Sequence, residues 1–107
     1  MKKIGIIGAG VAGSYLHALL KSTGHESQLY DVTSSYFKAC GEAITNSYSP
    51  KIPWKVIAEV HDFSFFVDGE LIYSTSFRHP KWLIIDKSAW INSMREDAIV
   101  GQRPNPA

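Results

Sequence analysis

The stretch that decides the fold is residues 3–31, KIGIIGAGVAGSYLHALLKSTGHESQLYD. Its first five residues form an apolar run rich in β-branched side chains, which is typical of a strand buried on both faces of a parallel sheet. After the glycines, apolar residues recur at the spacing of a helix with one broad buried face: Val11, Tyr15 and Leu19, then Ala12, Leu16 and Leu20. A second short strand, residues 27–31, ends the stretch. This order predicts a strand, a helix and a parallel strand with a right-handed crossover.

Three glycines between the first strand and the helix have separate mechanical roles. Gly8 permits a tight turn, Gly10 lets the backbone approach a pyrophosphate, and Gly13 lets helix and strand pack closely. Phosphates would then lie at the helix N-terminus, where free N–H groups attract negative charge. Asp31, which ends the second strand, would accept hydrogen bonds from an adenosine ribose and repel a 2′-phosphate. The pattern predicts a site for FAD or NAD; the alternative is simple turn glycines and an acid that ends a strand.

Composition excludes several other classes of protein. The chain has 107 residues, 45% of them hydrophobic, and a formal net charge of +1, as expected for one globular domain that does not bind nucleic acid. No apolar run is long enough to cross a bilayer, and we expect a cytoplasmic protein. The single cysteine and four scattered histidines predict no disulfide and no metal site. No Ser/His/Asp or Cys/His set can be assembled from spacing, so no catalytic residue is assigned.

The remainder of the chain departs from the pattern of a nicotinamide-binding domain, in which another helix and a third parallel strand would follow. We expect residues 32–54 to form a long loop, because they are rich in Ser, Thr and Pro, and residues 55–77 to form an antiparallel hairpin excursion that turns at Asp68-Gly69. A strand at 82–85 leads to a helix from residue 87 to about 98, with Asp86 as its N-cap. The helix would bury Trp90, Ile91, Met94 and Ala98 and expose Arg95, Glu96 and Asp97, and residues 100–107 would be a tail.

Three segments, in this order, resemble a known family. MKKIGIIGAGVAGSYLHALLKSTGHESQLYD is similar to the opening of FAD-dependent oxidoreductases of the hydroxybenzoate-hydroxylase type. KACGEAI (38–44) and WLIIDKSAWINSMREDA (82–98) resemble the geranylgeranyl reductase branch in particular. The resemblance implies an α/β fold: a single domain, 1–107, with a Rossmann-like FAD-binding βαβ unit and an antiparallel β-hairpin excursion, truncated relative to the family.

The resemblance also implies roles for individual residues. FAD would be the cofactor, with the glycine segment and Asp31 around its pyrophosphate and ribose, and with residues 38–42 near the flavin. Cys40, from its surroundings alone, is more often an inert thiol. Lys87 stands where the family carries an arginine, and lysine keeps the charge without the bidentate fork. The cofactor-binding set is Gly8, Gly10, Ala12, Gly13, Asp31, Lys38, Cys40, Gly41 and Lys87, with Glu42 beside it.

Family members run to several hundred residues, and the resemblance therefore implies an N-terminal domain or fragment that is inactive alone. The complete protein would reduce isoprenoid double bonds by hydride transfer from reduced flavin. Two alternatives stay open: a non-catalytic dinucleotide-binding remnant or interaction domain, and a small NAD-binding module. A second polypeptide would supply the missing part. Apolar surface at Phe65, Trp82 or Trp90 also predicts a homo-oligomer.

Overall fold

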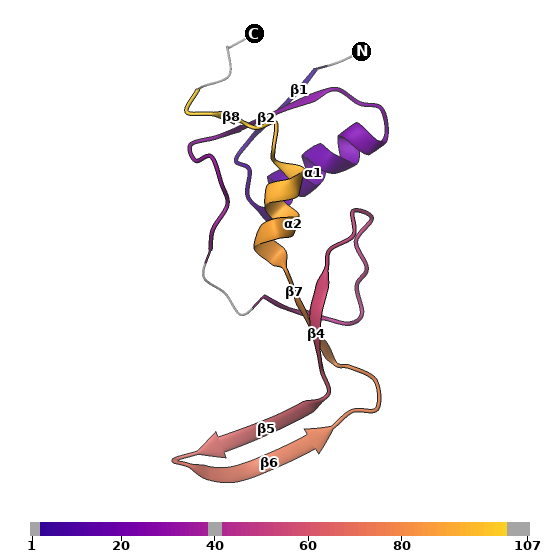
Figure 1. Ribbon diagram of the computed structural model, residues 1–107, viewed down its shortest axis with the longest axis vertical. Coiled ribbons are helices and arrows are strands. Elements are labelled where there is room, and N and C mark those ends of the chain that lie inside the picture. The colour runs from indigo at the N-terminus through magenta and orange to yellow at the C-terminus, as the bar shows by residue number, and fades with distance from the viewer. Residues whose placement is uncertain (1–2, 39–41, 103–107) are drawn as a thin grey trace.

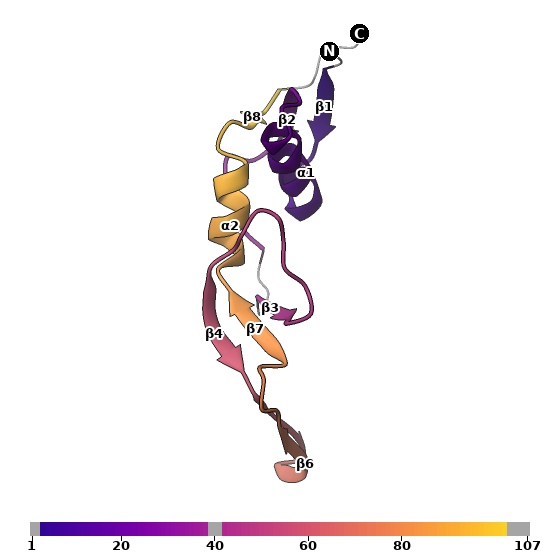
Figure 2. The same ribbon diagram turned by 90° about the vertical axis from the view of Figure 1, so that its right-hand side faces the viewer.

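The structure is a computed structural model that describes residues 3–38 and 42–102. The described chain forms two helices and eight strands (Figures 1 and 2). They are β1 (Ile4–Ile7), α1 (Val11–Ser22), β2 (Ser27–Asp31), β3 (Ala43–Thr45), β4 (Val56–Val60), β5 (Asp62–Val67), β6 (Glu70–Ser76), β7 (Trp82–Ile85), α2 (Lys87–Met94) and β8 (Ile99–Val100).

A small parallel sheet stands at one end of the molecule, in the order β1-β2-β8. Each residue of β1 pairs with one of β2, from Ile4 with Ser27 to Ile7 with Tyr30, and β8 adds two residues beside the end of β2. Ile6, Ala9 and Leu29 form the core here, with Ile4, Leu20 and Ala98 packed against them. The carboxyl ends of all three strands consequently open on the same edge of the sheet.

Gly13 sets how closely α1 approaches this sheet. A Cβ built on Gly13 would lie 1.9 Å from the carbonyl oxygen of Gly8 and 3.3 Å from a methyl group of Ile6. Any larger residue at position 13 must therefore push the helix away from the turn that follows β1. The close packing expected of the third glycine is present.

The middle of the molecule is an antiparallel sheet, β3-β7-β4, that leads into α2. Asp86 caps α2, because its carboxylate accepts a hydrogen bond from the Ala89 N–H (3.2 Å). A second core lies where α2 meets α1, and the Trp90 ring is 5.1 Å from Trp54 and 5.7 Å from Tyr15. Its buried members are Trp90, Ile91 and Met94. These aromatic contacts join α1, α2 and the segment before β4.

The hairpin of β5 and β6 projects beyond this body, at the lower end of Figure 1. The strands pair in an antiparallel manner and turn at Asp68-Gly69, as the sequence predicts. The molecule measures 60 × 29 × 19 Å, and its radius of gyration is 18.3 Å. A compact domain of about 100 residues has a radius of gyration near 13 Å. The described chain is therefore elongated, and the hairpin accounts for much of its length.

The predicted fold class is wrong. The protein is a mixed α/β structure in which strand residues outnumber helical ones, and its eight strands belong to three small sheets. The first two strands do pair in parallel, but no sheet flanked by helices grows from them among the described residues, and a Rossmann-like unit is not what they form. The reason is that, after β2, the chain leaves this sheet for two antiparallel ones and returns only for β8.

Both helices also differ from the predictions: α1 buries a different face, and α2 is shorter. In α1 the buried residues are Ser14 and His17, whereas Leu16 is 47% exposed. α2 ends at Met94 instead of continuing to about residue 98, and Arg95, predicted to face water, is 3% exposed. Polar partners supplied by other segments explain both differences, as described below. The predicted 32–54 loop contains β3, and the predicted tail begins inside β8.

We expect Gly13→Ala to destabilise the fold by about 2 kcal/mol or more, because the clash with the Gly8 carbonyl outweighs the better helix propensity of alanine. Gly5→Ala is the matched control, since a Cβ there meets only the Tyr30 ring at 4.0 Å. Urea unfolding followed by circular dichroism measures both. Equal stability of the two variants would show that the close approach at Gly13 is not a constraint.

Candidate nucleotide site at the edge of the parallel sheet

The glycine segment leaves bare backbone at the edge of the parallel sheet. Gly8 has a φ of 100°, a conformation that residues with a side chain rarely adopt, and its N–H donates to the Tyr30 carbonyl (2.8 Å). Gly10 precedes α1 and has an extended backbone. A Cβ at either position would meet no atom within 4 Å. Open space therefore lies beside the first and second glycines, whereas the third glycine is enclosed.

A cavity of about 660 Å³ lies against this segment. Its walls are the carboxyl ends of β1 and β2 and the chain after β8, namely Ile7, Gly8, Tyr30, Asp31, Val32, Gly101 and Gln102. Ligands of open parallel sheets bind outside the carboxyl ends of the strands. The cavity thus brings two of the predicted site residues, Gly8 and Asp31, to one place.

The carboxylate of Asp31 is held by several partners. One oxygen, Oδ2, accepts from the Ala9 N–H (3.3 Å) and is 2.9 Å from Arg95 Nη1, and the other, Oδ1, accepts from the Val32 N–H (2.7 Å). Burial would raise the pKa of Asp31, but the Val32 hydrogen bond, the Arg95 charge and the Ala9 hydrogen bond together lower it below its ordinary value. The residue therefore stays ionised, and its carboxylate retains lone pairs that can accept further hydrogen bonds.

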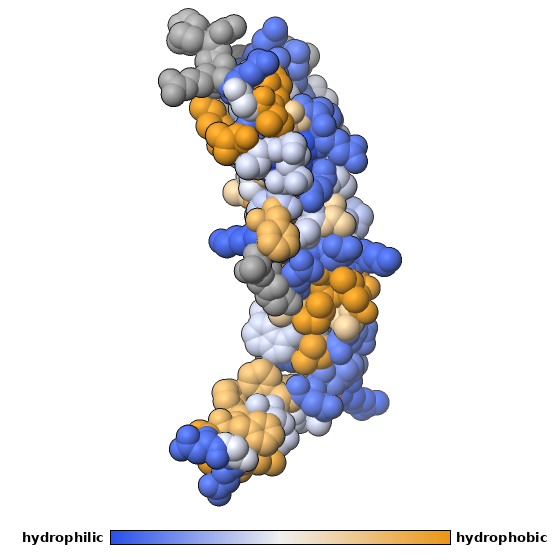
Figure 3. Space-filling view, turned by 60° about the vertical axis from the view of Figure 1, so that its left-hand side comes forward, coloured by the Kyte–Doolittle hydropathy of each residue, from blue (hydrophilic) through white to orange (hydrophobic). Residues whose placement is uncertain are grey.

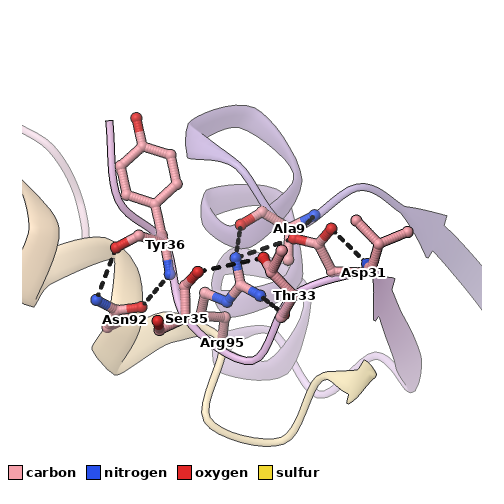
Figure 4. Close-up of polar contacts among 8 residues, drawn as sticks. Ala9, Asp31, Thr33, Ser35, Tyr36, Asn92 and Arg95 are labelled. Atoms are coloured by element: carbon pink, nitrogen blue, oxygen red, sulfur yellow. Dashed lines mark hydrogen bonds and ion pairs between the residues drawn. The ribbon is translucent and has the colours of Figure 1, made fainter. Parts of the chain in front are cut away.

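Arg95 is the residue that sequence analysis missed at this site (Figure 4). Its guanidinium is buried, donates to the carbonyl oxygens of Ala9 (2.7 Å) and Thr33, and pairs with Asp31. It joins the glycine turn, the segment after β2 and the segment after α2. The helical pattern gave no signal for this role, because α2 ends one residue earlier and Arg95 then points inward.

A smaller cavity, of about 300 Å³, adjoins the first turn of α1. Glu42 and Lys87 both line it, together with Val11 of the first turn of α1. Its remaining walls are largely aromatic and aliphatic: Tyr15, Ala43, Ile44, Tyr48, Trp54, Ile85 and Trp90. The structure therefore brings Lys87 and Glu42 to the start of α1, on different elements from Asp31.

Four of the predicted site residues that the structure describes line neither cavity. Ala12 is exposed in the first turn of α1, and Lys38 is exposed in the segment after β2. Gly10 directly precedes α1, and Gly13 is enclosed against the Gly8 carbonyl. Cys40 and Gly41 lie outside the described residues.

A buried imidazole explains the unexpected face of α1. His17 is 1% exposed and contacts Ser27 Oγ through Nδ1 (2.6 Å) and Asp97 Oδ1 through Nε2 (2.9 Å). Lys21 donates to the same carboxylate (2.9 Å). Burial would raise the pKa of Asp97, but the contacts with Lys21 and His17 lower it. Sequence spacing did not reveal this Ser, His and Asp set, in which the buried imidazole links α1 to β2 and to the segment after α2.

Comparison with models of protein families finds no match for this chain, and comparison with curated proteins finds no significant match either. In the described part of the chain, neither helix is long and apolar enough to span a membrane. Residues 3–38 and 42–102 also contain no group of three or more His, Cys, Asp or Glu side chains able to hold a metal ion.

We expect Arg95→Met to reduce the free energy of unfolding by about 3 kcal/mol or more, because it leaves the Asp31 carboxylate without its cationic partner and two carbonyls without their donor. Lys55→Met, at an exposed lysine, is the control and should change it by less than about 0.5 kcal/mol. Urea unfolding at neutral pH is the measurement. A small effect of Arg95→Met would contradict the role assigned to the guanidinium.

Acid should weaken the fold through Asp31 and Asp97. Both carboxyls have lowered pKa values in the folded protein. Each therefore stabilises the fold at pH values above its pKa in the unfolded chain, about 3.9, and this stabilisation is lost as the pH falls through the pKa in the folded protein. We therefore expect the free energy of unfolding to decrease as the pH is lowered below about 4. Asp97→Asn should flatten part of this decrease. If the free energy of unfolding of that variant fell with pH as steeply as that of the natural chain, Asp97 would make no contribution to the acid sensitivity.

Proposed function

We propose that this chain binds an adenine dinucleotide, with FAD as the first choice, through its adenosine diphosphate end at the edge of the parallel sheet. The observation that carries the proposal is the bare backbone at two glycines: Gly8 lines a cavity of about 660 Å³, and Gly10 directly precedes the N-terminus of α1. Backbone N–H groups in the first turn of a helix have no partner within the helix and attract phosphates.

The arrangement fits the successive parts of adenosine diphosphate. The pyrophosphate would lie beside Gly10, where a side chain is absent and the dipole of α1 favours negative charge. Asp31 Oδ1 would accept a hydrogen bond from a ribose hydroxyl, and the carboxylate would repel a 2′-phosphate. Ile7 and Tyr30 would provide apolar contact for the base. None of these contacts requires a Rossmann sheet.

The resemblance to the geranylgeranyl reductase branch makes FAD the first choice. The smaller cavity beside Val11 supports this choice, because its aromatic walls suit a planar ring and Lys87 brings a cation close to the start of α1. A bound flavin would supply hydride-transfer chemistry, while this chain would bind and orient it. We assign no catalytic side chain, and we propose that the chain does not reduce an isoprenoid by itself.

A non-catalytic dinucleotide-binding or interaction domain is the second candidate, because the exposed hairpin suits contact with another protein. A small NAD-binding module is the third. Calorimetric titration with ADP, FAD and NAD separates these functions. Similar and modest affinity for ADP and FAD, weaker than about 1 µM, is expected if only the adenosine diphosphate end is held. Tight FAD binding that survives gel filtration, with weak ADP binding, would instead require a complete flavin site.

Gly10→Val is expected to abolish the binding of both ADP and FAD, since a branched side chain would occupy the space that the pyrophosphate needs. The fold should survive, because the backbone at position 10 is extended, and the weaker helix cap costs only about 1 kcal/mol. Calorimetry measures binding, and urea unfolding measures the fold. Ala58→Val, at an exposed position of β4 that lines neither cavity, is the control and should bind as the natural chain does.

Asp31 is better tested through the ligand than by substitution, because a change of Asp31 would also leave Arg95 without its ion pair. ADP that carries a 2′-phosphate should bind at least about tenfold more weakly than ADP, as a repelled or unaccommodated charge costs more than about 1.4 kcal/mol. Equal affinity for the two ligands would place the ribose away from Asp31. Retained ADP binding in Gly10→Val would overturn the proposed site as a whole.

A further inference from the structure

The contacts of His17 join a serine and an aspartate into one chain of hydrogen bonds. His17 lies within α1, Ser27 begins β2, and Asp97 lies in the turn between α2 and β8. The imidazole is 1% exposed, with Nδ1 2.6 Å from Ser27 Oγ and Nε2 2.9 Å from Asp97 Oδ1. A nucleophilic hydroxyl, a base and a group that orients the base are thus all within hydrogen-bond reach of one another in sequence.

The Asp97 carboxylate determines which imidazole nitrogen carries the hydrogen. Burial raises the pKa of Asp97, but hydrogen bonds from Lys21 and His17 lower it below its ordinary value, so the carboxylate is ionised at neutral pH. An ionised carboxylate only accepts hydrogen bonds, and the neutral imidazole must therefore carry its hydrogen on Nε2. Nδ1 then has a free lone pair, to which the Ser27 hydroxyl donates. In this arrangement an imidazole can take the proton of a nucleophilic hydroxyl.

Ser27 is the member of this set that a ligand can reach. Its residue is half-buried and lines a cavity of about 380 Å³. The other walls of this cavity are Lys21, Gly24, His25 and Glu26. Small-molecule sites in proteins have volumes from about 300 Å³ upward. The cavity lies at the amino end of β2, whereas the cavity beside Gly8 includes Tyr30 and Asp31 at the carboxyl end of this strand, so the two sites are separate.

The lining of the cavity beside Ser27 is polar. Apolar side chains gather elsewhere, for example over the β5–β6 hairpin at the lower end of the molecule in Figure 3. Lys21 and Glu26 bring charges of both signs to the cavity, which gives no net attraction for an anion or a cation. A cation in the wall also stabilises negative charge that develops on a carbonyl oxygen. These features favour a small, uncharged, polar ligand with a carbonyl group.

We propose that Ser27 is a catalytic nucleophile and that this chain cleaves small carboxylic esters in the cavity beside it. Ser27 Oγ attacks the carbonyl carbon while its proton passes to His17 Nδ1, and Asp97 holds the imidazole in the required tautomer. The bond between the carbonyl carbon and the alkoxy oxygen then breaks, and the leaving alcohol takes the proton from His17. Water next attacks the acyl-serine, one of its protons passes through His17 to Ser27 Oγ, and the carboxylic acid leaves. The reaction requires no nucleotide at Gly8.

A purely structural role for the set makes a different prediction. A buried imidazole needs partners whether or not it takes part in catalysis. What points to chemistry is that the partner of Nδ1 is a primary hydroxyl in the wall of a cavity. In a structural role, Ser27 would react no faster than an exposed serine. Ser22 is a matched serine of this kind, because it is exposed at the end of α1 and its hydroxyl donates to the Leu19 carbonyl (2.8 Å).

Diisopropyl fluorophosphate tests the nucleophile, because an activated serine forms a stable bond from Oγ to its phosphorus as fluoride leaves. At neutral pH the natural chain and Ser22→Ala should each form a single adduct, which peptide mass spectrometry should locate at Ser27. Ser27→Ala should form none. Asp97→Asn has nearly the same shape but no longer fixes the tautomer, and it should react at least about tenfold more slowly. No adduct at Ser27, or an unchanged rate in Asp97→Asn, would overturn the proposal.

Ser27→Cys is a second variant that retains a nucleophile and a partner for His17. Transfer of the thiol proton to His17 should make iodoacetamide alkylate position 27 at least about tenfold faster than position 22 in Ser22→Cys. Peptide mass spectrometry separates both positions from Cys40. Release of p-nitrophenolate from p-nitrophenyl acetate measures ester cleavage, which should be lost in Ser27→Ala and retained in Ser22→Ala. Equal alkylation at positions 27 and 22, or equal ester cleavage by the two alanine variants, would show that Ser27 is not activated.

Discussion

The buried guanidinium of Arg95 is the constraint on which the site depends. It reaches three separate segments: the glycine turn through the Ala9 carbonyl, the end of β2 through Asp31, and the following chain through Thr33. A buried cation is costly unless it is paired and hydrogen-bonded, so these segments are held in one arrangement. The chain after α2 therefore organises a turn 86 residues earlier in the sequence.

This constraint also determines what the site can offer a ligand. Arg95 and the Ala9 N–H hold the Asp31 carboxylate, whose pKa is lowered, in the wall of the cavity. Gly13 brings α1 against the Gly8 carbonyl, so the first turn of the helix starts beside open space. The parts that would recognise an adenosine diphosphate are thus positioned by packing and ion pairing within the folded chain, before any ligand arrives.

Local signals in the sequence predicted the elements but not their assembly. The turn at Gly8, the close packing at Gly13, the Asp86 cap and the Asp68-Gly69 turn depend largely on neighbouring residues, and each of these four features is present. The fold class depended on which strands meet after β2, and that is set by contacts far apart in the chain. Burial of Arg95 and His17 was likewise hidden, because the partners that make it favourable come from other elements.

Amide chemical shifts during a titration with ADP test the central claim most directly, because they report the location of binding and not only its strength. We predict saturable shifts at Gly8, Ala9, Gly10 and Val32, which surround the open backbone and Asp31, and unchanged shifts in the β5–β6 hairpin. No saturable shift in the glycine segment at millimolar ADP, or the largest shifts in another part of the chain, would contradict the account.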